Sequence, residues 1–509
     1  MRFFPAHEPR IPLGTYRNWF FPRTLYLPLD AARTHMHVLG KTGSGKSYFL
    51  ASLFLSLYLA GQPVTLIDPH GDLAQLVLAQ LVAQGQLETA EQRQRLLYLD
   101  LPAAAAEGRY LPFNFLAQPY DDHAMAEHVT EAARRAWPEL AHGAPTFENI
   151  LKHSVVALRE AGLPLTCLSD LLTDTSFRND ILQTRVHDPQ VIRFFRLRMD
   201  MWGRDAPVMK ESTLNRADLL TLSPILRYAL GHQDNVLDFR RLIDSGTSLI
   251  VNLSVASPDT RRLFGCLLTV GMETAALSRA NLRAAGRRLR TPHVLMIDEF
   301  SQFMAQSEES LTRMLSETRK YKLYCVMAHQ NWSQASDRLK GALQNVGIEA
   351  IFKAGRPDAE YSARLFGTVD TEAIKHVVAD EAAEKRTHPT FYPLPEQWEH
   401  TTQEIQQLDV GEAFFRLPDD RLQRLQRVHT PRLPDLPPVP HGLDEIERYY
   451  LDRYFQPPPV GSGTLPPSID SQPLTVSPVI GRRVGAQAPK ARSPSGRTVF
   501  AYSRRKGGR

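Results

Sequence analysis

Residues 40–47 are Gly40-Lys41-Thr42-Gly43-Ser44-Gly45-Lys46-Ser47, which satisfies the pattern G-x-x-x-x-G-K-[S/T] in full. A β-prone run, 34–39, precedes this loop, and an apolar helical run, 48–60, follows it. The glycines let the backbone curl so that its N–H groups face phosphate oxygens, and the helix N-terminus adds partial positive charge. We therefore predict a phosphate-binding loop for ATP and Mg²⁺. Lys46 would reach the β- and γ-phosphates, and Ser47 would ligate Mg²⁺.

A second apolar strand, 294–297, ends in two adjacent acids, Asp298 and Glu299. In a parallel sheet the carboxyl end of this strand lies beside the phosphate loop. We expect Asp298 to hold Mg²⁺ through water and Glu299 to polarise the attacking water as general base. The pair favours an ATPase over a kinase, which would bind a second organic substrate. The competing interpretation is an exposed acidic pair that merely follows a core strand.

The next apolar strand, 323–328, ends in His329 and Gln330. An amide at the end of such a strand can sense the γ-phosphate or position water. It can also serve only to cap a helix, and both interpretations of Gln330 stay open.

Strand and helix patterns alternate over residues 1–120 and return over 237–430, which predicts an α/β fold with a parallel sheet and crossover helices. Amphipathic helical spacing dominates 121–236, which predicts an all-α domain inserted in the α/β domain. Twelve prolines between 431 and 480 exclude regular packing, apart from a helical segment at 441–454. Residues 431–509 are therefore expected to be a Pro-rich, then basic, mostly disordered C-terminal tail.

The net charge of +5 is unevenly distributed. Residues 471–509 hold nine Lys/Arg and no Asp/Glu, which leaves −4 for residues 1–470. Any nucleic-acid contact of the body must therefore use local patches. One candidate is a basic surface formed by arginines around 279–290, for which a solvated loop is the alternative: Arg279, Arg283, Arg287, Arg288 and Arg290.

The basic tail could bind DNA, an acidic partner or anionic lipid, or could be flexible with no partner of its own. Phe500 and Tyr502 are its candidates for stacking on bases.

The cysteines and the hydropathy of the sequence indicate the cellular compartment. Cys167, Cys266 and Cys325 lie far apart without metal-ligand spacing, so each is expected to be a buried apolar residue in a reducing compartment. The longest apolar run, 49–60, is shorter than the ~20 residues that span a bilayer. We expect a cytoplasmic protein with no transmembrane segment of its own, which a partner could recruit to the inner face of the membrane.

Taken in order and spacing, the motifs resemble the FtsK/HerA-type DNA-pumping ATPases. Within them the chain is most similar to the type IV secretion coupling proteins, the TraG-like conjugative DNA-transfer ATPases. The resemblance spans residues 34–430 and rests on the following stretches: 37–47, 66–72, 238–241, 249–254, 297–303, 317–321, 328–330, 345–347 and 358–360.

The resemblance implies a hexameric ring of RecA-like P-loop domains, with each ATP at a subunit interface. It also implies an arginine finger from the neighbouring subunit. Arg319 matches the family's arginine position, with a solvated helix face as the alternative and Arg356 as the second candidate. Asp68 and His70 are expected close to the nucleotide, with no chemical role assigned. Coupling proteins usually begin with transmembrane helices, and none is visible in this sequence.

The leading functional hypothesis is an ATP-driven translocase of DNA in conjugative or mobile-element transfer. One alternative keeps the motor but delivers protein substrates to a secretion channel. Another is a HerA-like DNA-repair translocase that works with a nuclease. The expected partners are accordingly DNA, further copies of the chain, and a relaxosome, a secretion channel or a nuclease. By family analogy, the helical insertion would recognise the cargo.

Overall fold

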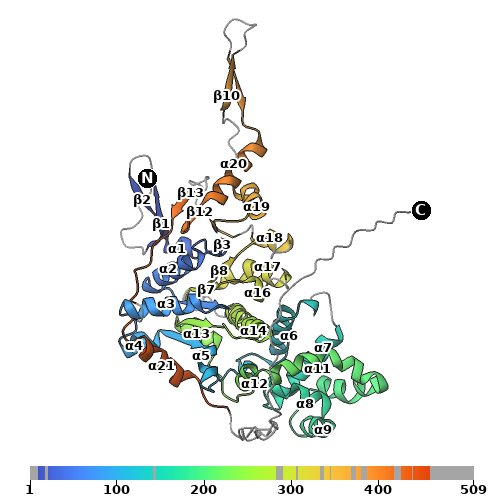
Figure 1. The fold of residues 1–509 in the computed structure, drawn as a ribbon. Coiled ribbons are helices and arrows are strands. Elements are labelled where there is room, and N and C mark those ends of the chain that lie inside the picture. Colours follow the sequence, from blue (N-terminus) through green and yellow to red (C-terminus); the bar gives the residue numbers. More distant parts are fainter. Residues whose placement is uncertain are drawn as a thin grey trace, which may run out of the picture. The chain divides into compact units, whose positions relative to one another are not determined.

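The computed structural model describes residues 10–17, 21–140, 145–281, 290–304, 308–332, 337–343, 346–367, 374–379, 387–417, 426–437 and 440–458 (Figure 1). Residues 1–460 form one compact unit, to which all the described residues belong.

An eleven-stranded sheet forms the centre of this unit, in the order β2-β1-β13-β12-β9-β3-β8-β7-β4-β6-β5. All neighbours from β9 to β5 are parallel, which confirms the predicted α/β fold. These strands are short apolar runs buried on both faces, as parallel sheets require. Their bounds are β3 (Met36–Leu39), β4 (Val64–Asp68), β5 (Leu96–Asp100), β6 (Ser248–Asn252), β7 (His293–Ile297), β8 (Leu323–His329) and β9 (Ile348–Phe352).

Helices cover both faces of this sheet. Successive residues of β4 point to opposite sides, so that Leu66 and Ile67 belong to separate hydrophobic cores. One core is completed by α2 (Lys46–Leu59) and α3 (Asp72–Ala83). The other is completed by α13 (Phe239–Ser245), α14 (Pro258–Leu277), α17 (Glu308–Glu317) and α19 (Arg356–Phe366).

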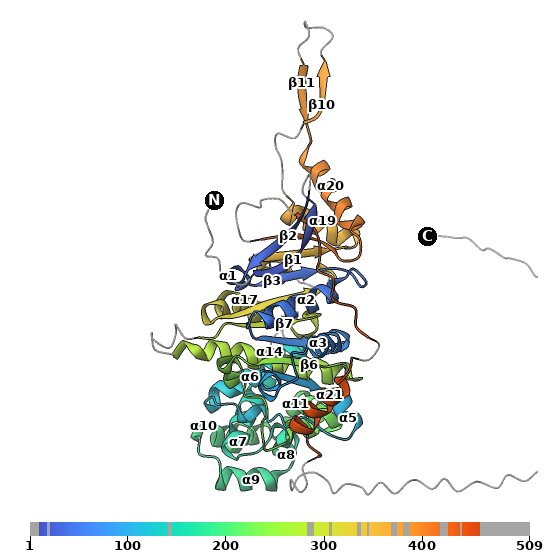
Figure 2. The same ribbon diagram turned by 90° about the vertical axis from the view of Figure 1, so that its left-hand side faces the viewer.

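Four antiparallel strands extend the sheet beyond β9, and the sequence analysis did not predict them. They are β1 (Arg10–Arg17), β2 (Pro22–Pro28), β12 (Glu412–Arg416) and β13 (Gln426–His429). A separate hairpin of β10 (Ile374–Ala379) and β11 (Thr387–Phe391) projects away from the main sheet beside α20 (Leu394–Gln407) (Figure 2).

Between β5 and β6, the named elements of the described residues are all helical. After α5 (Leu101–Ala106) they are η1 (Phe115–Ala117), α6 (Asp122–Ala136), η2 (Pro138–Leu140), α7 (Pro145–Glu160), η3 (Leu165–Cys167), α8 (Leu168–Thr173), α9 (Thr175–Thr184), α10 (Pro189–Arg193), η4 (Phe194–Arg198), η5 (Asp200–Asp205), α11 (Ala206–Leu222), α12 (Pro224–Leu230) and α13. Helices α11 and α12 are separated by Ser223, which is extended before Pro224 and caps α12.

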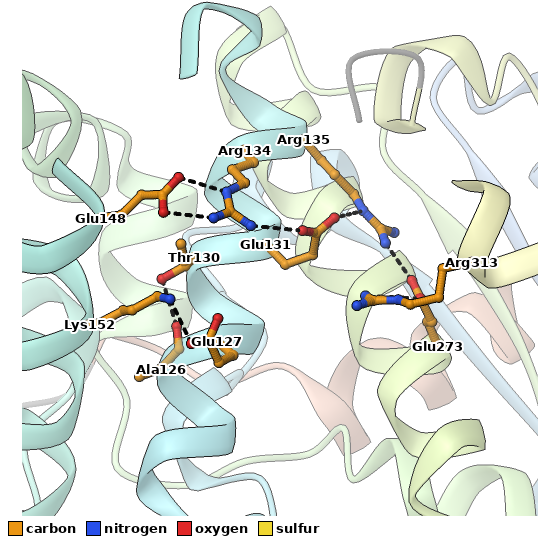
Figure 3. A network of polar contacts seen from close by, with 10 residues as sticks. All are labelled: Ala126, Glu127, Thr130, Glu131, Arg134, Arg135, Glu148, Lys152, Glu273 and Arg313. Carbon is orange, nitrogen blue, oxygen red and sulfur yellow. Dashed lines mark hydrogen bonds and ion pairs between the residues drawn. The ribbon is translucent and has the colours of Figure 1, made fainter. Parts of the chain in front are cut away.

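The helical segment is attached to the sheet through α14, which packs against α6. Arg135 of α6 and Glu273 of α14 form an ion pair in which both side chains are fully buried (Figure 3). Arg313 of α17 approaches the same carboxylate, at 3.4 Å. On the other side of α6, Arg134 binds Glu148 of α7 through two hydrogen bonds of 2.8 and 2.7 Å. A chain of charges therefore runs from α7 through α6 and α14 to α17.

The helix expected over 441–454 is present at Leu443–Tyr454, and the described residues around it, 431–437 and 440–458, also pack against the body, although their prolines predicted otherwise. The carbonyl of Pro434 accepts a hydrogen bond from the Gln80 side chain at 2.7 Å. Helix α21 (Leu443–Tyr454) buries Tyr450, whose hydroxyl donates to the carbonyl of Arg93 at 3.1 Å. Prolines suit the extended part of this segment, and its apolar helix face adds to the core. The basic tail, with Phe500 and Tyr502, lies outside the described residues.

All three cysteines are buried, as expected. Within the part of the chain that the structure describes, no helix has the length and hydropathy needed to cross a bilayer.

Candidate nucleotide site

The phosphate loop lies between β3 and α2 and is tied to three neighbouring segments. The Gly40 amide donates to the carbonyl of His329 at 3.2 Å, and the Lys41 amide donates to the carbonyl of Lys353 at 3.0 Å. The carbonyl of Ser44 accepts from the amide of Gly411 at 2.9 Å. These bonds fix the loop against the carboxyl ends of β8 and β9 and against the turn before β12.

The inner face of the loop has the donors that a phosphate needs. Among the described residues, no acceptor contacts the amides of Gly43, Gly45, Lys46 and Ser47. Gly43 and Gly45 have φ angles of 78° and 96°, and Gly45 immediately precedes the first turn of α2. No atom lies within 4 Å of the Cβ position at Gly43, so the loop is open on that side. Free amides at a helix N-terminus form an anion site, and the residues present fit a nucleotide phosphate.

Lys46, Asp298 and Glu299 come together as the sequence predicts. The Lys46 Nζ atom lies 2.6 Å from Glu299 Oε1 and 3.3 Å from Asp298 Oδ1, and all three side chains are almost fully buried. The Asp298 amide donates to the carbonyl of Ile67 at 3.2 Å, which fixes the end of β7 beside β4. The two acids are therefore buried beside the phosphate loop and do not form an exposed pair.

The backbone of Glu299 is left-handed, with φ of 47°, which is uncommon for a residue other than glycine. Such strain persists only where surrounding contacts over-determine it, and it is concentrated at functional sites. The Glu299 amide donates to Asp298 Oδ1 at 3.1 Å, which orients the two carboxylates with respect to each other.

The residues present also fit Mg²⁺. Ser47 follows Lys46 in the chain, and the Asp298 carboxylate lies 3.3 Å from the Lys46 ammonium; hydroxyl and carboxylate oxygens are the hard ligands that Mg²⁺ prefers.

Gln330 lies against the loop. Its Oε1 atom accepts a hydrogen bond from Thr42 Oγ1 at 3.1 Å. The structure thus places the amide at the phosphate loop, where a sensing or water-positioning role requires it to be.

Asp68 is close to the site, as expected, and has a structural task there. Its two carboxylate oxygens accept from the amides of His70 and Ala74, both at 2.9 Å, and so fix the turn into α3. Burial raises the pKa of Asp68, helped by the nearby Asp298 carboxylate.

The two candidate arginine fingers lie at opposite ends of the parallel strands. Arg319 is exposed in η7 (Thr318–Tyr321), before β8 begins, whereas the phosphate loop lies at the other end of the strands. The seven residues of β8 span ~20 Å between these two ends, so Arg319 cannot reach the nucleotide site of its own chain. Arg356 begins α19 at the loop's edge, where it is paired with Glu360 and Glu399.

The proposed basic surface around residue 279 is corrected by the structure. Arg279 is fully buried and donates to the carbonyls of Thr291 and Tyr321 and to the carboxylate of Asp244. Arg290 is also buried and stacks on Tyr321 at 5.0 Å. Both arginines serve to hold η7 and the start of β7 in place. Arg283, Arg287 and Arg288 lie outside the described residues.

Sequence reasoning missed two neighbours of the loop. Gly411 supports it from the turn before β12, and a Cβ on Gly45 would lie 2.7 Å from the Gly411 amide nitrogen. Glu349 of β9 bonds His37, immediately behind the loop, at 2.6 Å. Neither residue belongs to a recognisable motif, and each is more than 300 positions from its partner.

Comparison with known proteins shows similarity in one domain and in the fold. Residues 22–157 match the sequence profile of the family described as "Helicase HerA, central domain". This part of the chain is therefore similar to the central domain of HerA-type proteins. None of the curated protein sequences compared with it matches.

Solved structures of the bacterial conjugative coupling protein TrwB share the wider fold. A truncated TrwB bound to sulphate is 16% identical, with a TM-score of 0.53, over 82% of this chain and 89% of that one. TrwB with ADP and Mg²⁺ is 16% identical, with a TM-score of 0.51, over 86% and 98%. TrwB with the ATP analogue ADPNP is 16% identical, with a TM-score of 0.52, over 85% and 97%. At such identities the likeness establishes the fold, and it confirms the resemblance expected from the motifs.

Proposed function

We propose that this chain is the ATPase of a conjugative coupling system and that it uses ATP hydrolysis to move DNA. The observation that carries the proposal is the convergence of Lys46, Asp298 and Glu299 beside a loop with free amides. Since TrwB shares the fold and has been solved with ADP and Mg²⁺, the same ligands suit this site.

In the mechanism we propose, nucleotide binding redistributes the contacts of Lys46. In the structure the ammonium is bonded to Glu299 at 2.6 Å. The loop amides and Lys46 would bind the β- and γ-phosphates, and Lys46 would then release the carboxylate. Glu299 would be free to accept a proton from the attacking water, and Gln330 would orient that water. Mg²⁺, held by Ser47 and Asp298, would neutralise charge on the phosphates.

DNA as the cargo has a direct test in steady-state ATPase measurements. We expect duplex or single-stranded DNA of matched length to stimulate hydrolysis by the full chain, and higher salt to weaken the effect. Lys46→Ala should abolish both basal and stimulated rates. Hydrolysis that no DNA alters would overturn the DNA motor and favour delivery of protein substrates.

The proposed ring assigns Arg319 to the neighbouring subunit's site, since it cannot reach its own. Arg319→Ala and Lys46→Ala chains should each be nearly inactive alone, because a finger contributes ~10³–10⁵ in rate. Mixed together, they should regain activity at interfaces where an intact loop meets an intact arginine. Arg356→Ala is the control. It should not lose its activity when alone, and so should show no recovery on mixing with Lys46→Ala. Failure of the mixture to regain activity, with mixed rings demonstrated, would remove Arg319 from the mechanism.

A further inference from the structure

Three buried titratable side chains form a row across adjacent strands directly behind the phosphate loop. His37 of β3 is paired in register with Glu349 of β9, while His329 of β8 is paired with Leu39, two residues further along β3. The three side chains therefore share one face of the sheet. His37 Nδ1 lies 2.6 Å from Glu349 Oε2, and His37 Nε2 lies 2.7 Å from His329 Nε2. All three residues are fully buried.

The contacts assign a direction to these hydrogen bonds. Burial, helped by the Lys46 charge, lowers the pKa of His329 well below its ordinary value, so this ring is neutral and carries one proton. Its Nδ1 has no acceptor among the described residues, so a proton there would be a buried, unsatisfied donor. The proton therefore belongs on Nε2, which donates to His37. The Nδ1–H of His37 then donates to Glu349.

The row of side chains is connected through the backbone to Gln330, which contacts the phosphate loop. Gln330 follows His329, whose carbonyl accepts the Gly40 amide. Two residues after Gln330, the Trp332 ring packs 4.9 Å from the His37 ring and 5.3 Å from the His329 ring. Trp332 is itself anchored to α19, through its amide to Asp358 at 2.8 Å and its indole N–H to Ser362 at 3.0 Å. Gln330 is thus flanked by two side chains that both pack on His37.

We propose that the Glu349–His37–His329 row is a positioning device that holds Gln330 against the phosphate loop for hydrolysis. The inference rests on the proposed function, because Gln330 matters only if the site hydrolyses ATP. The row acts through the backbone of β8 and not through the phosphate-binding amides or Lys46. Its loss should therefore lower kcat and leave nucleotide affinity nearly unchanged.

The test compares three variants of the full chain. His329→Leu removes the bond to His37, and His329→Gln restores a side-chain donor. His293→Leu is the matched control, since His293 is equally buried in the same sheet and bonds Thr65 at 2.8 Å, but stands at the start of β7, away from the loop. We expect kcat of His329→Leu to fall ~10- to 100-fold, as for a slightly misplaced group. The Kd for a fluorescent ATP analogue should stay within about threefold of wild type.

His329→Gln should recover most of the lost kcat, and His293→Leu should keep kcat per folded molecule near wild type. Equal losses in His329→Leu and His293→Leu would overturn the proposal, because the effect would then be general destabilisation. So would a His329→Leu chain with unchanged kcat. If the wild-type chain binds ATP but never hydrolyses it, the proposed function itself fails.

A second readout does not depend on activity. In nitrogen-15 spectra of the histidine-labelled full chain at neutral pH, we expect His329 to carry its proton on Nε2, assigned by comparison with His329→Gln. Protonation of both ring nitrogens, or of Nδ1 alone, would contradict the direction of the row.

Discussion

At the scale of single residues, the site depends on a few backbone positions that only certain side chains can occupy. Gly45 combines a φ of 96° with the close approach of Gly411. Glu299 holds a left-handed backbone that places its carboxylate on Lys46. The octapeptide pattern predicts the glycine backbone at Gly45 from the sequence. The left-handed backbone of Glu299 can be found only from the contacts of the folded chain.

Gly45→Ala should weaken nucleotide binding. Its Cβ would be strained by the positive φ and would press on the Gly411 amide, 2.7 Å away. A local cost of ~1–3 kcal/mol corresponds to about 5- to 150-fold in affinity. Gly61→Ala is the control, because Gly61 has a φ of 74° but no atom within 4 Å of the added Cβ. Isothermal titration with ADP should show a loss in the first variant only, and equal affinities would refute the role of the Gly411 contact.

His293 should make stability depend on pH. Burial, together with the nearby Arg279 charge, lowers its pKa to about 3. Below about pH 6.5 the unfolded chain takes up a proton that the folded chain refuses. The free energy of unfolding should therefore fall as pH drops, by at most about 1.4 kcal/mol per pH unit for this proton.

Urea unfolding of the wild type and His293→Gln, between about pH 7 and pH 5, checks this sign. The variant should show the shallower decline. It should keep part of the slope, because burial also lowers the pKa values of His35 and His128 to about 4. Identical slopes for the two proteins would contradict the assignment.

At the scale of elements, α14 connects the helical segment to the sheet. Its Glu273 accepts from Arg135 of α6, where both side chains are excluded from water, and also lies near Arg313 of α17 (Figure 3). Since α17 leads into η7, which carries Arg319, this charge chain links the helical segment to the proposed finger.

Glu273→Gln should destabilise the fold, because it removes one of the two carboxylates that pair with the buried Arg135 charge, the other being Glu131. Breaking a buried pair from one side costs up to about 3–5 kcal/mol. Lys152→Ala removes a partly exposed pair with Glu127 in the same neighbourhood and should cost less than about 1 kcal/mol. Urea midpoints compare the two variants. A Glu273→Gln chain no less stable than Lys152→Ala would show that the buried pair contributes nothing.

The parallel strands could be predicted closely from the sequence, because each is a short apolar run with a turn or loop at its end. The strands expected over 34–39, 294–297 and 323–328 match β3, β7 and β8 to within two residues at each end. The antiparallel strands could not, since Pro12 and Gly14 weaken the strand pattern of β1. Its pairing with β13 joins Thr15 to His429 and has no local signal.

For the site too, short continuous stretches of sequence were predictive, and contacts between distant residues were not. Residues within continuous motifs, such as Lys46 and Glu299, were placed correctly relative to each other. The contact between His37 and Glu349 spans 312 positions, so only the order of the strands reveals it. Arg279 looked like part of a basic surface because its partners, Asp244 and Thr291, are distant in sequence or unremarkable.

At the scale of the whole molecule, residues 426–437 and 440–458 add the last strand and the last helix of the compact unit. Strand β13 joins the N-terminal hairpin to β12, and α21 packs against β5 and α3. These contacts make a proline-rich segment part of the folded unit, although its composition suggested otherwise.

A chain that ends at Pro458 should therefore keep the melting temperature of the full chain, whereas one that ends at Pro440 should melt at a lower temperature. The shorter chain loses α21 and the buried Tyr450, at a cost of at least ~3 kcal/mol. Differential scanning fluorimetry with and without ADP compares the two. Equal melting temperatures would show that α21 is dispensable for stability.

Hydrolysis of ATP by one assembled site is the central claim, and Glu299→Gln tests it most directly. The substitution keeps the size of the side chain and a hydrogen-bond acceptor for Lys46 but removes the proposed base. Measured with the full chain, radiolabelled ATP should bind with near wild-type affinity, while single-turnover hydrolysis falls at least ~10²-fold. A Glu299→Gln chain that hydrolyses ATP as fast as wild type would contradict the account.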